Sequence, residues 1–173
     1  YDTAGFPKDS AYVFRAERTD YKKAPFVHIF PHWDFDEGQP VDVRVCSNAP
    51  RVELFLNGES QGALDIDHKH GQKLTSDYII PYHKGELRAV AYDENGNIIA
   101  EDTARSFGDA VKLEAVPDKT ALHADSSDLI YLEIAAYDEN GTFCANASNR
   151  VNVTVDGAGR LLGLDNGDST DYD

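Results

Sequence analysis

His32 and Trp33 are well suited to contact a ligand, and Trp33 is the only tryptophan of the chain. Sugars are bound by an aromatic face beside polar groups that fix their hydroxyls, and an indole next to an imidazole supplies both. A lone tryptophan in a small β-sandwich also serves as an anchor in the core or between modules. The pair therefore has two interpretations, substrate contact by His32 and Trp33 or packing.

Acidic loops supply the oxygen ligands that calcium prefers. Asp165, Asp168 and Asp171 predict a calcium site if their loop curls around an ion, and a solvated turn otherwise. The stretch 93–96, Asp-Glu-Asn-Gly, has similar residues, but its glycine comes too early for an EF-hand loop and no glutamate follows at the twelfth position. We interpret it as a hairpin turn. The cofactor prediction is none, with calcium at the C-terminal loop as the alternative.

A softer ligand mixture occurs at Asp65, Asp67, His68 and His70, where alternate residues of an extended chain face the same way. Zinc and nickel bind such sets, but a closed site needs ligands from elsewhere in the chain. The neighbouring lysine and glycine favour a hydrated loop instead.

Nucleophilic and acid–base catalysis lack a recognisable motif in this sequence. Carboxylates are abundant, yet none lies in an apolar segment that would raise its pKa for acid catalysis. The sequence contains neither a Gly-x-Ser-x-Gly elbow nor a phosphate-binding glycine loop. Cys46 and Cys144 have no histidine partner by local motif, and we expect each to be a small buried hydrophobic residue. We predict no catalytic residue.

The elements that would position these residues show the two-residue period of half-buried strands. Valines at 41, 43 and 45 share one face, and apolar residues at 52, 54 and 56 repeat the pattern after a turn. Asn57-Gly58 is a strong hairpin signal. Further strands are expected at residues 60–64, 72–80, 85–92 and 97–106. About seven strands in some eighty residues indicate a sandwich of immunoglobulin type.

The second half of the chain repeats this organisation. The sequence Ala-Tyr-Asp-Glu-Asn-Gly at 91–96 recurs at 136–141, each time where a strand ends and the chain reverses. Strands are expected at residues 111–116, 129–137, 150–155 and 159–164. The predicted fold class is all-β, with two tandem immunoglobulin-like antiparallel β-sandwiches and one short N-terminal helix.

The predicted helix covers residues 6–15, with Pro7 in the first turn and with Ala11 and Phe14 on one face. A helix this short with one apolar stripe is not stable alone in water, so we expect its packing partner to lie upstream of this chain. The predicted organisation is a helix and linker at 1–24, a first sandwich at 25–108 and a second sandwich at 109–173.

Composition limits the classes of partner. The chain has 173 residues with 16 Lys and Arg against 31 Asp and Glu, which gives a formal net charge of −15. Nucleic acid and anionic membranes are therefore poor partners. No stretch approaches the roughly twenty apolar residues of a membrane helix. The chain contains no methionine and begins at Tyr1, from which we expect a fragment or a trimmed product.

Three runs carry a specific resemblance. Pro-His-Trp-Asp-Phe at 31–35, Val-Glu-Leu-Phe-Leu-Asn-Gly-Glu-Ser at 52–60 and Gly-Ala-Gly-Arg-Leu-Leu-Gly at 157–163 resemble the region that follows the barrel in family 2 glycoside hydrolases, chiefly β-galactosidases. Residues 4–10 are similar to the start of the last barrel helix in that family. Together these matches extend over nearly the whole chain.

The resemblance implies a non-catalytic accessory region of a bacterial enzyme whose upstream barrel hydrolyses terminal β-galactosides. That barrel would be its partner, with carbohydrate and oligomer contacts also expected. The Asn-Glu dipeptide that carries the general acid in the family is absent from this sequence. The second sandwich is short of a final strand by comparison with the family. Two alternatives stay open, a carbohydrate-binding module and a cell-surface immunoglobulin-like repeat, and the compartment is undetermined.

Overall fold

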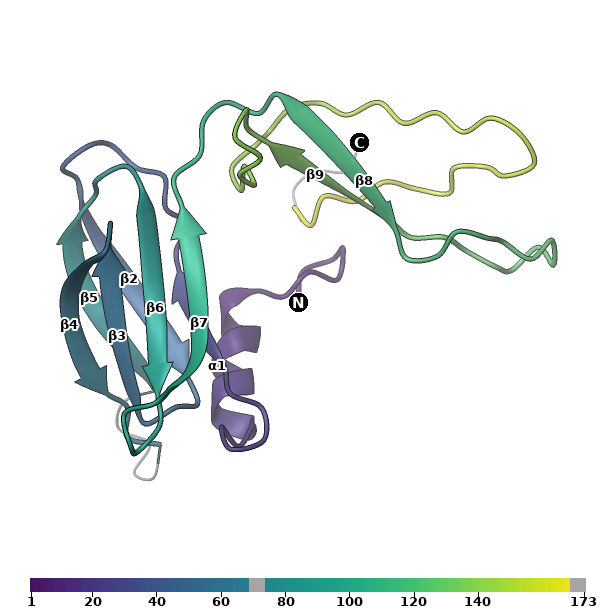
Figure 1. Cartoon of the computed structure of the whole chain (residues 1–173). Helices are drawn as coiled ribbons and strands as arrows, with labels where there is room; N and C mark the ends of the chain where they lie inside the picture. Colours follow the sequence, from purple (N-terminus) through teal and green to yellow (C-terminus); the bar gives the residue numbers. More distant parts are fainter. Residues whose placement is uncertain (69–73, 169–173) are drawn as a thin grey trace.

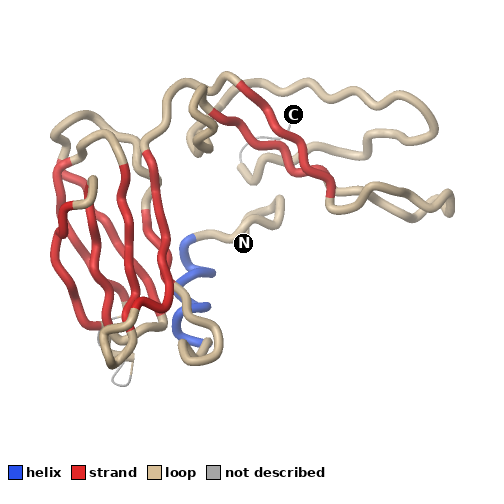
Figure 2. The backbone as a smooth tube through the Cα atoms, viewed as in Figure 1, coloured by secondary structure: helices blue, strands red, loops and turns tan. Residues whose placement is uncertain are grey.

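Antiparallel β-structure dominates the chain, as predicted (Figures 1 and 2). The structure is a computed structural model that describes residues 1–68 and 74–168. In chain order the elements are α1 (Asp9–Arg18), β1 (Val27–Phe30), β2 (Pro40–Ser47), β3 (Arg51–Leu56), β4 (Glu59–Asp65), β5 (Thr75–Pro81), β6 (Glu86–Tyr92), β7 (Ile98–Arg105), β8 (Lys112–Pro117) and β9 (Leu132–Tyr137). Within the described residues, no helix combines the length and apolarity needed to cross a membrane.

Strands β1 to β7 form two facing sheets, which we call the N-terminal sandwich. One sheet has the order β1-β2-β5 and the other the order β4-β3-β6-β7, and neighbouring strands are antiparallel in both. The predicted alternation is confirmed in β3 and in β2 as far as Val45, whereas Cys46 and Ser47 at the end of β2 are buried as well. The inward side chains of both sheets form one core, because each apolar residue removed from water stabilises the fold by roughly 1.5–3 kcal/mol.

Helix α1 begins later than predicted. Lys8 has an extended backbone, with φ of −82° and ψ of 164°, so the helix starts at Asp9 instead of at Phe6. Asp9 lies in the first turn and Arg15 and Arg18 in the last, where their charges complement the helix dipole.

The helix packs on the outer face of the sheet that contains β1. Tyr12, Val13 and Ala16 contact a cluster of Phe26, Phe30 and Cys46 on that face. In Figure 1 the helix stands against the edge of the N-terminal sandwich where β1 and β7 meet. The sheet thus supplies the packing partner that so short a helix requires.

Asn48 fixes the segment that joins α1 to β1. Its side chain is buried, and its Oδ1 accepts a hydrogen bond from the Phe26 amide at 2.9 Å. Its Nδ2 donates to the Thr19 hydroxyl at 2.9 Å and to the Ala24 carbonyl at 2.8 Å. One amide side chain therefore satisfies polar groups along the whole connection.

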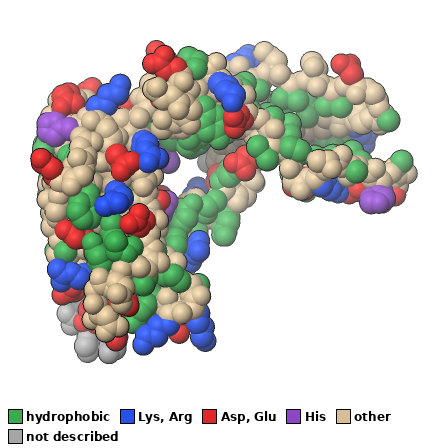
Figure 3. Space-filling view, in the orientation of Figure 1, with side chains coloured by type: hydrophobic (Ala, Val, Ile, Leu, Met, Phe, Trp, Pro, Cys, Tyr) green, Lys and Arg blue, Asp and Glu red, His purple; other side chains and the backbone are tan. Residues whose placement is uncertain are grey.

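Strands β8 and β9 form a separate two-stranded sheet, which we call the C-terminal ribbon. Leu113 lies opposite Ala136, and Ala115 lies opposite Ile134, so one face of the ribbon is apolar. Leu113 is 53% exposed. Figure 3 shows hydrophobic side chains spread over this part of the molecule. An apolar face of this kind usually marks a contact surface.

The strands predicted at 150–155 and 159–164 are not strands in the structure. Both segments lie in the described part of the chain and run as extended loops beyond β9 (Figure 1). Val155, Leu161 and Leu164 are exposed there. A β-strand needs a neighbour that pairs with its backbone, and an alternating sequence alone does not provide one.

Candidate functional site

Trp33 lies in the core of the N-terminal sandwich with no exposed surface. Its ring centroid is 4.9 Å from that of Tyr82 and 6.2 Å from that of Phe35, and its Nε1 donates a hydrogen bond to the His83 carbonyl at 3.0 Å. A buried indole has no face to offer a sugar. The packing interpretation of Trp33 is therefore the one that its burial supports, and direct substrate contact by this ring does not fit the structure.

His32 has the opposite environment from its neighbour and is exposed to solvent. His83, whose carbonyl accepts the Trp33 hydrogen bond, has its Nδ1 atom 2.5 Å from Glu37 Oε1. The hydrogen bond from His83 lowers the pKa of the Glu37 carboxyl. Substrate contact by His32 stays a prediction.

The C-terminal acidic loop forms a turn that uses its own carboxylate oxygens. Asp165 Oδ1 accepts hydrogen bonds from the Gly167 amide at 2.7 Å and from the Thr3 hydroxyl at 3.2 Å, and the Asp168 amide donates to Asn166 Oδ1 at 2.9 Å. Asp171 lies outside the described residues. Within residues 1–68 and 74–168, no three His, Cys, Asp or Glu side chains are close enough to hold one metal ion. The calcium site stays a prediction.

The second predicted ligand set is divided among different partners. Asp65 pairs with Arg51 at 3.3 Å, and His68 Nδ1 lies 2.8 Å from the Glu17 carboxylate of α1. His70 is not among the described residues. Asp65 and His68 thus serve as tethers, and His68 holds the helix against the sandwich.

The repeated hairpin has the same hydrogen bonds in both halves of the chain. Asp93 accepts bonds through its side chain from the amides of Asn95 and Asn97 at 2.8 and 2.9 Å. Asp138 does the same with Asn140 and Thr142 at 2.9 and 2.7 Å. The interpretation of these acidic loops as turns is supported. Asp138 additionally accepts the Gly108 amide at 3.0 Å, which ties the linker to the C-terminal ribbon.

A cysteine, a histidine and an aspartate meet on the sheet face beneath α1. His28 of β1 lies directly opposite Cys46 of β2 in the strand register, and His28 Nδ1 is 2.9 Å from Asp102 Oδ2 of β7. The Tyr12 ring of α1 covers the imidazole, with 3.8 Å between the ring centroids. Sequence motifs miss this set because its members come from three strands and one helix.

The arrangement contains the residue types of a nucleophilic triad but not the electrostatics of one. Burial raises the pKa of the Cys46 thiol to about 12, with a smaller contribution from the Asp102 charge. A nucleophilic cysteine needs the opposite shift, and Cys46 has no exposed surface. His28, Asp102 and Cys46 instead form the surface on which the helix docks.

Helix docking should therefore control the reactivity of Cys46. We expect Tyr12→Ala to increase the rate of Cys46 alkylation by iodoacetamide at pH 8 by about tenfold or more, because the helix loses its contact with His28 and opens more often. Peptide mass spectrometry of the quenched reaction measures the rate at each cysteine. Cys144, which is buried next to the Gly108 carbonyl and is not part of the cluster under α1, is the internal control. An unchanged Cys46 rate would show that Tyr12 does not hold the helix.

Two family models match the chain. Residues 38–100 match a domain of unknown function (DUF4982), and residues 113–173 match the glycoside hydrolase family 2 C-terminal domain 5. The first match covers much of the N-terminal sandwich, and the second covers the C-terminal ribbon and the loops beyond it.

Several bacterial proteins are similar over most of the chain. A β-galactosidase of Bacteroides ovatus is 37% identical over 96% of the chain, and a protein described as a putative β-glucuronidase of Formosa agariphila is 28% identical over 98%. The chain spans 19% and 16% of the lengths of these two relatives.

Solved structures give the same result. A β-glycosidase from Bacteroides vulgatus matches with a TM-score of 0.76 and 30% identity over 86% of the chain, which is 18% of that protein. A glycosyl hydrolase family 2 member from Bacteroides cellulosilyticus matches with a TM-score of 0.73 and 30% identity, over 82% of the chain and 21% of that protein. The fold described above therefore recurs as one part of much longer proteins.

Proposed function

We propose that this chain, whose residues 113–173 match the glycoside hydrolase family 2 C-terminal domain 5, is the accessory part of an enzyme that hydrolyses terminal β-galactosides. In this proposal, the chain packs against an upstream catalytic barrel of the same polypeptide and chemistry takes place on the barrel. The similarity to the Bacteroides ovatus β-galactosidase supports the choice of substrate class. Retaining hydrolysis needs two carboxyl groups held about 5 to 5.5 Å apart on a rigid scaffold, which the barrel would supply.

The main observation in support of this proposal is the exposed apolar face of α1. Ala11 and Phe14 lie together, as the sequence predicts, but they face away from the sheet that Tyr12 and Ala16 contact. With Tyr1 they line a shallow apolar groove of about 410 Å³. Phe14 is 64% exposed. A short helix with one face on the sandwich and a second apolar face open is well placed to be covered by a neighbouring domain.

Arg15 is the charged residue that lines this groove, and its position leaves the groove accessible to an apolar partner. Arg15 lies at the margin of the groove, but its guanidinium is 4.3 Å from the centroid of the Phe26 ring. This cation–π contact turns the charge toward the sandwich. The rest of the lining consists of Tyr1, Ala11 and Phe14 together with the uncharged Ser10.

Docking through this groove can be tested in the full-length enzyme. We expect Phe14→Ser to lower the free energy of unfolding of the full-length enzyme by about 1–3 kcal/mol, because a buried aromatic contact with the barrel is lost. The same substitution in the isolated chain should change stability by less than about 0.5 kcal/mol, because Phe14 is exposed there. Urea titrations of both proteins, followed by circular dichroism, give the two values.

Ile79→Ser is the matched control, because Ile79 is 76% exposed on β5 and lies outside the groove. It should leave both proteins unchanged. An equal effect of Phe14→Ser on the isolated chain and the full-length enzyme would contradict docking at this face. Turnover of an aryl β-galactoside by the isolated chain would contradict the accessory role itself.

A further inference from the structure

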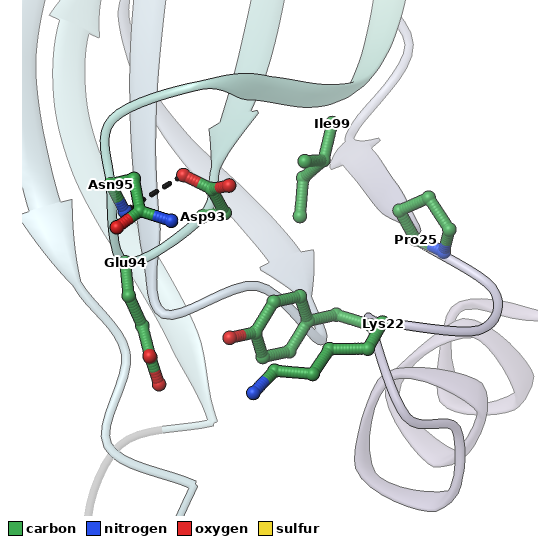
Figure 4. Close-up of a pocket in the computed structure, with 7 residues that line it drawn as sticks. Lys22, Pro25, Asp93, Glu94, Asn95 and Ile99 are labelled. Carbon is green, nitrogen blue, oxygen red and sulfur yellow. Dashed lines mark hydrogen bonds between the residues drawn. The ribbon is translucent and has the colours of Figure 1, made fainter.

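A depression opens between the segment that follows α1 and the hairpin that joins β6 to β7 (Figure 4). It has a volume of about 380 Å³ and lies on the N-terminal sandwich, apart from the groove on the outer face of α1. One wall is lined by Tyr21, Lys22 and Pro25, and the other wall is lined by Glu94 and Ile99. These residues are some seventy positions apart in the sequence, so only the fold brings them together.

Both walls are held in place by internal hydrogen bonds. On the hairpin, Asp93 binds the amides of Asn95 and Asn97 through its carboxylate, as described above. On the opposite wall, Asp20 Oδ1 accepts the Lys22 amide at 3.0 Å, and the Ala24 carbonyl is held by the buried Asn48. The walls are therefore ordered before any ligand arrives, which reduces the entropic cost of binding.

Glu94 and Lys22 extend from these walls, and their charged groups are not used in the hydrogen bonds that hold the walls in place. The Glu94 carboxylate and the Lys22 ammonium make no hydrogen bond or ion pair with any described residue, and the Lys22 ammonium lies over the Tyr21 ring, 5.6 Å from its centroid. Figure 4 shows both side chains extending beside the depression. One strong acceptor and one strong donor are thus available beside the apolar surfaces of Tyr21, Pro25 and Ile99.

This combination matches the chemistry of a sugar. Tyr21, Pro25 and Ile99 offer an apolar surface for the C–H face of a pyranose ring. A carboxylate accepts hydrogen bonds from two vicinal hydroxyls, and an ammonium donates to others, and both kinds of bond are strengthened by the charge. We infer that the depression between residues 21–25 and 93–99 is a binding site for one neutral pyranose unit of a glycan.

The charges select a neutral sugar over an acidic one. Asp93 and Glu94 place two carboxylates at the site against the single ammonium of Lys22, and the chain carries a net charge of −15. A uronate or a phosphate would be repelled by this field. The inference goes beyond the proposed accessory role, because it gives the chain a ligand of its own outside the barrel.

Titration of the 173-residue chain with methyl β-D-galactopyranoside, followed by ¹H–¹⁵N correlation spectra, tests the site. We expect saturable shifts at the amides of Lys22 and Asn95 with a dissociation constant of about 1–10 mM, since an open depression contacts only one face of the sugar. Methyl β-D-glucopyranosiduronate should bind at least about tenfold more weakly. Shifts that do not saturate by about 100 mM would overturn the site, and equal binding of the two glycosides would overturn its neutral selectivity.

Glu94→Gln should weaken galactoside binding by about tenfold, because the charged acceptor becomes a neutral amide. Glu139→Gln is the matched control, since Glu139 occupies the same place in the repeated hairpin and is exposed on the C-terminal part. Equal weakening by both variants, or by neither, would overturn the assignment. Both variants change exposed side chains, so folding is retained in each case. The assay needs no catalytic turnover, so its failure is distinguishable from a failure of the accessory role.

Discussion

Replacing Trp33 with alanine is expected to lower the free energy of unfolding of the isolated chain by about 3–5 kcal/mol. The indole has no exposed surface and packs against Tyr82 and Phe35, so its removal leaves a cavity between the two sheets. The His83 carbonyl also loses the hydrogen bond from the indole. A loss of this size is a large fraction of the total stability of a small domain.

The adjacent residue is the control for this prediction. His32→Ala removes an exposed side chain and should change stability by less than about 0.5 kcal/mol. Urea unfolding, monitored by circular dichroism because the variant lacks tryptophan, gives the values. Trp33→Phe keeps an aromatic ring in the cavity and should cost about 1–2 kcal/mol, so it stays measurable if the alanine variant fails to fold. A Trp33→Ala effect as small as that of His32→Ala would contradict the packing role.

The sequence identifies His32 and Trp33 as residues of interest. It does not predict which of the two substitutions costs more stability. From residue type alone, His32 and Trp33 are equally good candidates for ligand contact, because both carry rings with polar atoms. The structure separates them in the loop between β1 and β2, where Trp33 is buried and its neighbour His32 is exposed. Trp33 turns inward toward Tyr82 and His32 turns outward.

Local patterns predicted the parts of the fold that depend on local chemistry. The Asp-Glu-Asn-Gly turns at 93–96 and 138–141 have the same side-chain hydrogen bonds, because an aspartate can bind backbone amides two and four residues ahead. The alternating strands β2 and β3 likewise follow from burial of one face.

Features that depend on partners far apart in the chain were missed. The pairing of His28 with Asp102 spans 74 positions and joins strands of different sheets, and no spacing rule connects them. The alternation at 150–155 predicts a strand equally well whether or not a neighbour is there to pair with it, and the structure provides none in the described part of the chain. Periodicity reports which face of a strand would be buried, and the tertiary partner decides whether the strand forms.

The Asp102 carboxylate is the second position where a single change should have a large effect. Asp102 Oδ2 of β7 accepts the Ile29 amide at 2.9 Å and lies 2.9 Å from His28 Nδ1, so it joins the two sheets at the edge that α1 covers. Asp102→Ala leaves the part-buried Ile29 amide without this acceptor. We expect a loss of about 2–3 kcal/mol in the free energy of unfolding at pH 7, measured by urea titration.

Asp77→Ala is the matched control, because Asp77 also sits on a strand and pairs with a basic side chain. Its contact with Arg44, at 2.7 Å, is on the surface, where both side chains are at least half exposed. An exposed pair contributes about 0–1 kcal/mol, so the control should lie well below Asp102→Ala. Equal losses in the two variants would show that Asp102 does not link the sheets.

The pH dependence gives an independent test of the same link. Burial raises the pKa of the Asp102 carboxyl, but the hydrogen bonds from His28 and the Ile29 amide outweigh it and hold this pKa below its ordinary value. A carboxyl whose folded-state pKa is lowered contributes stability above the unfolded-state value of about 4, and loses that contribution as the pH falls through the folded-state pKa. The stability difference between the wild-type chain and Asp102→Asn should therefore shrink as the pH falls below about 4. If the difference instead grew as the pH fell below about 4, the protonated carboxyl would be the stabilising form and the proposed link through the ionised carboxylate would be wrong.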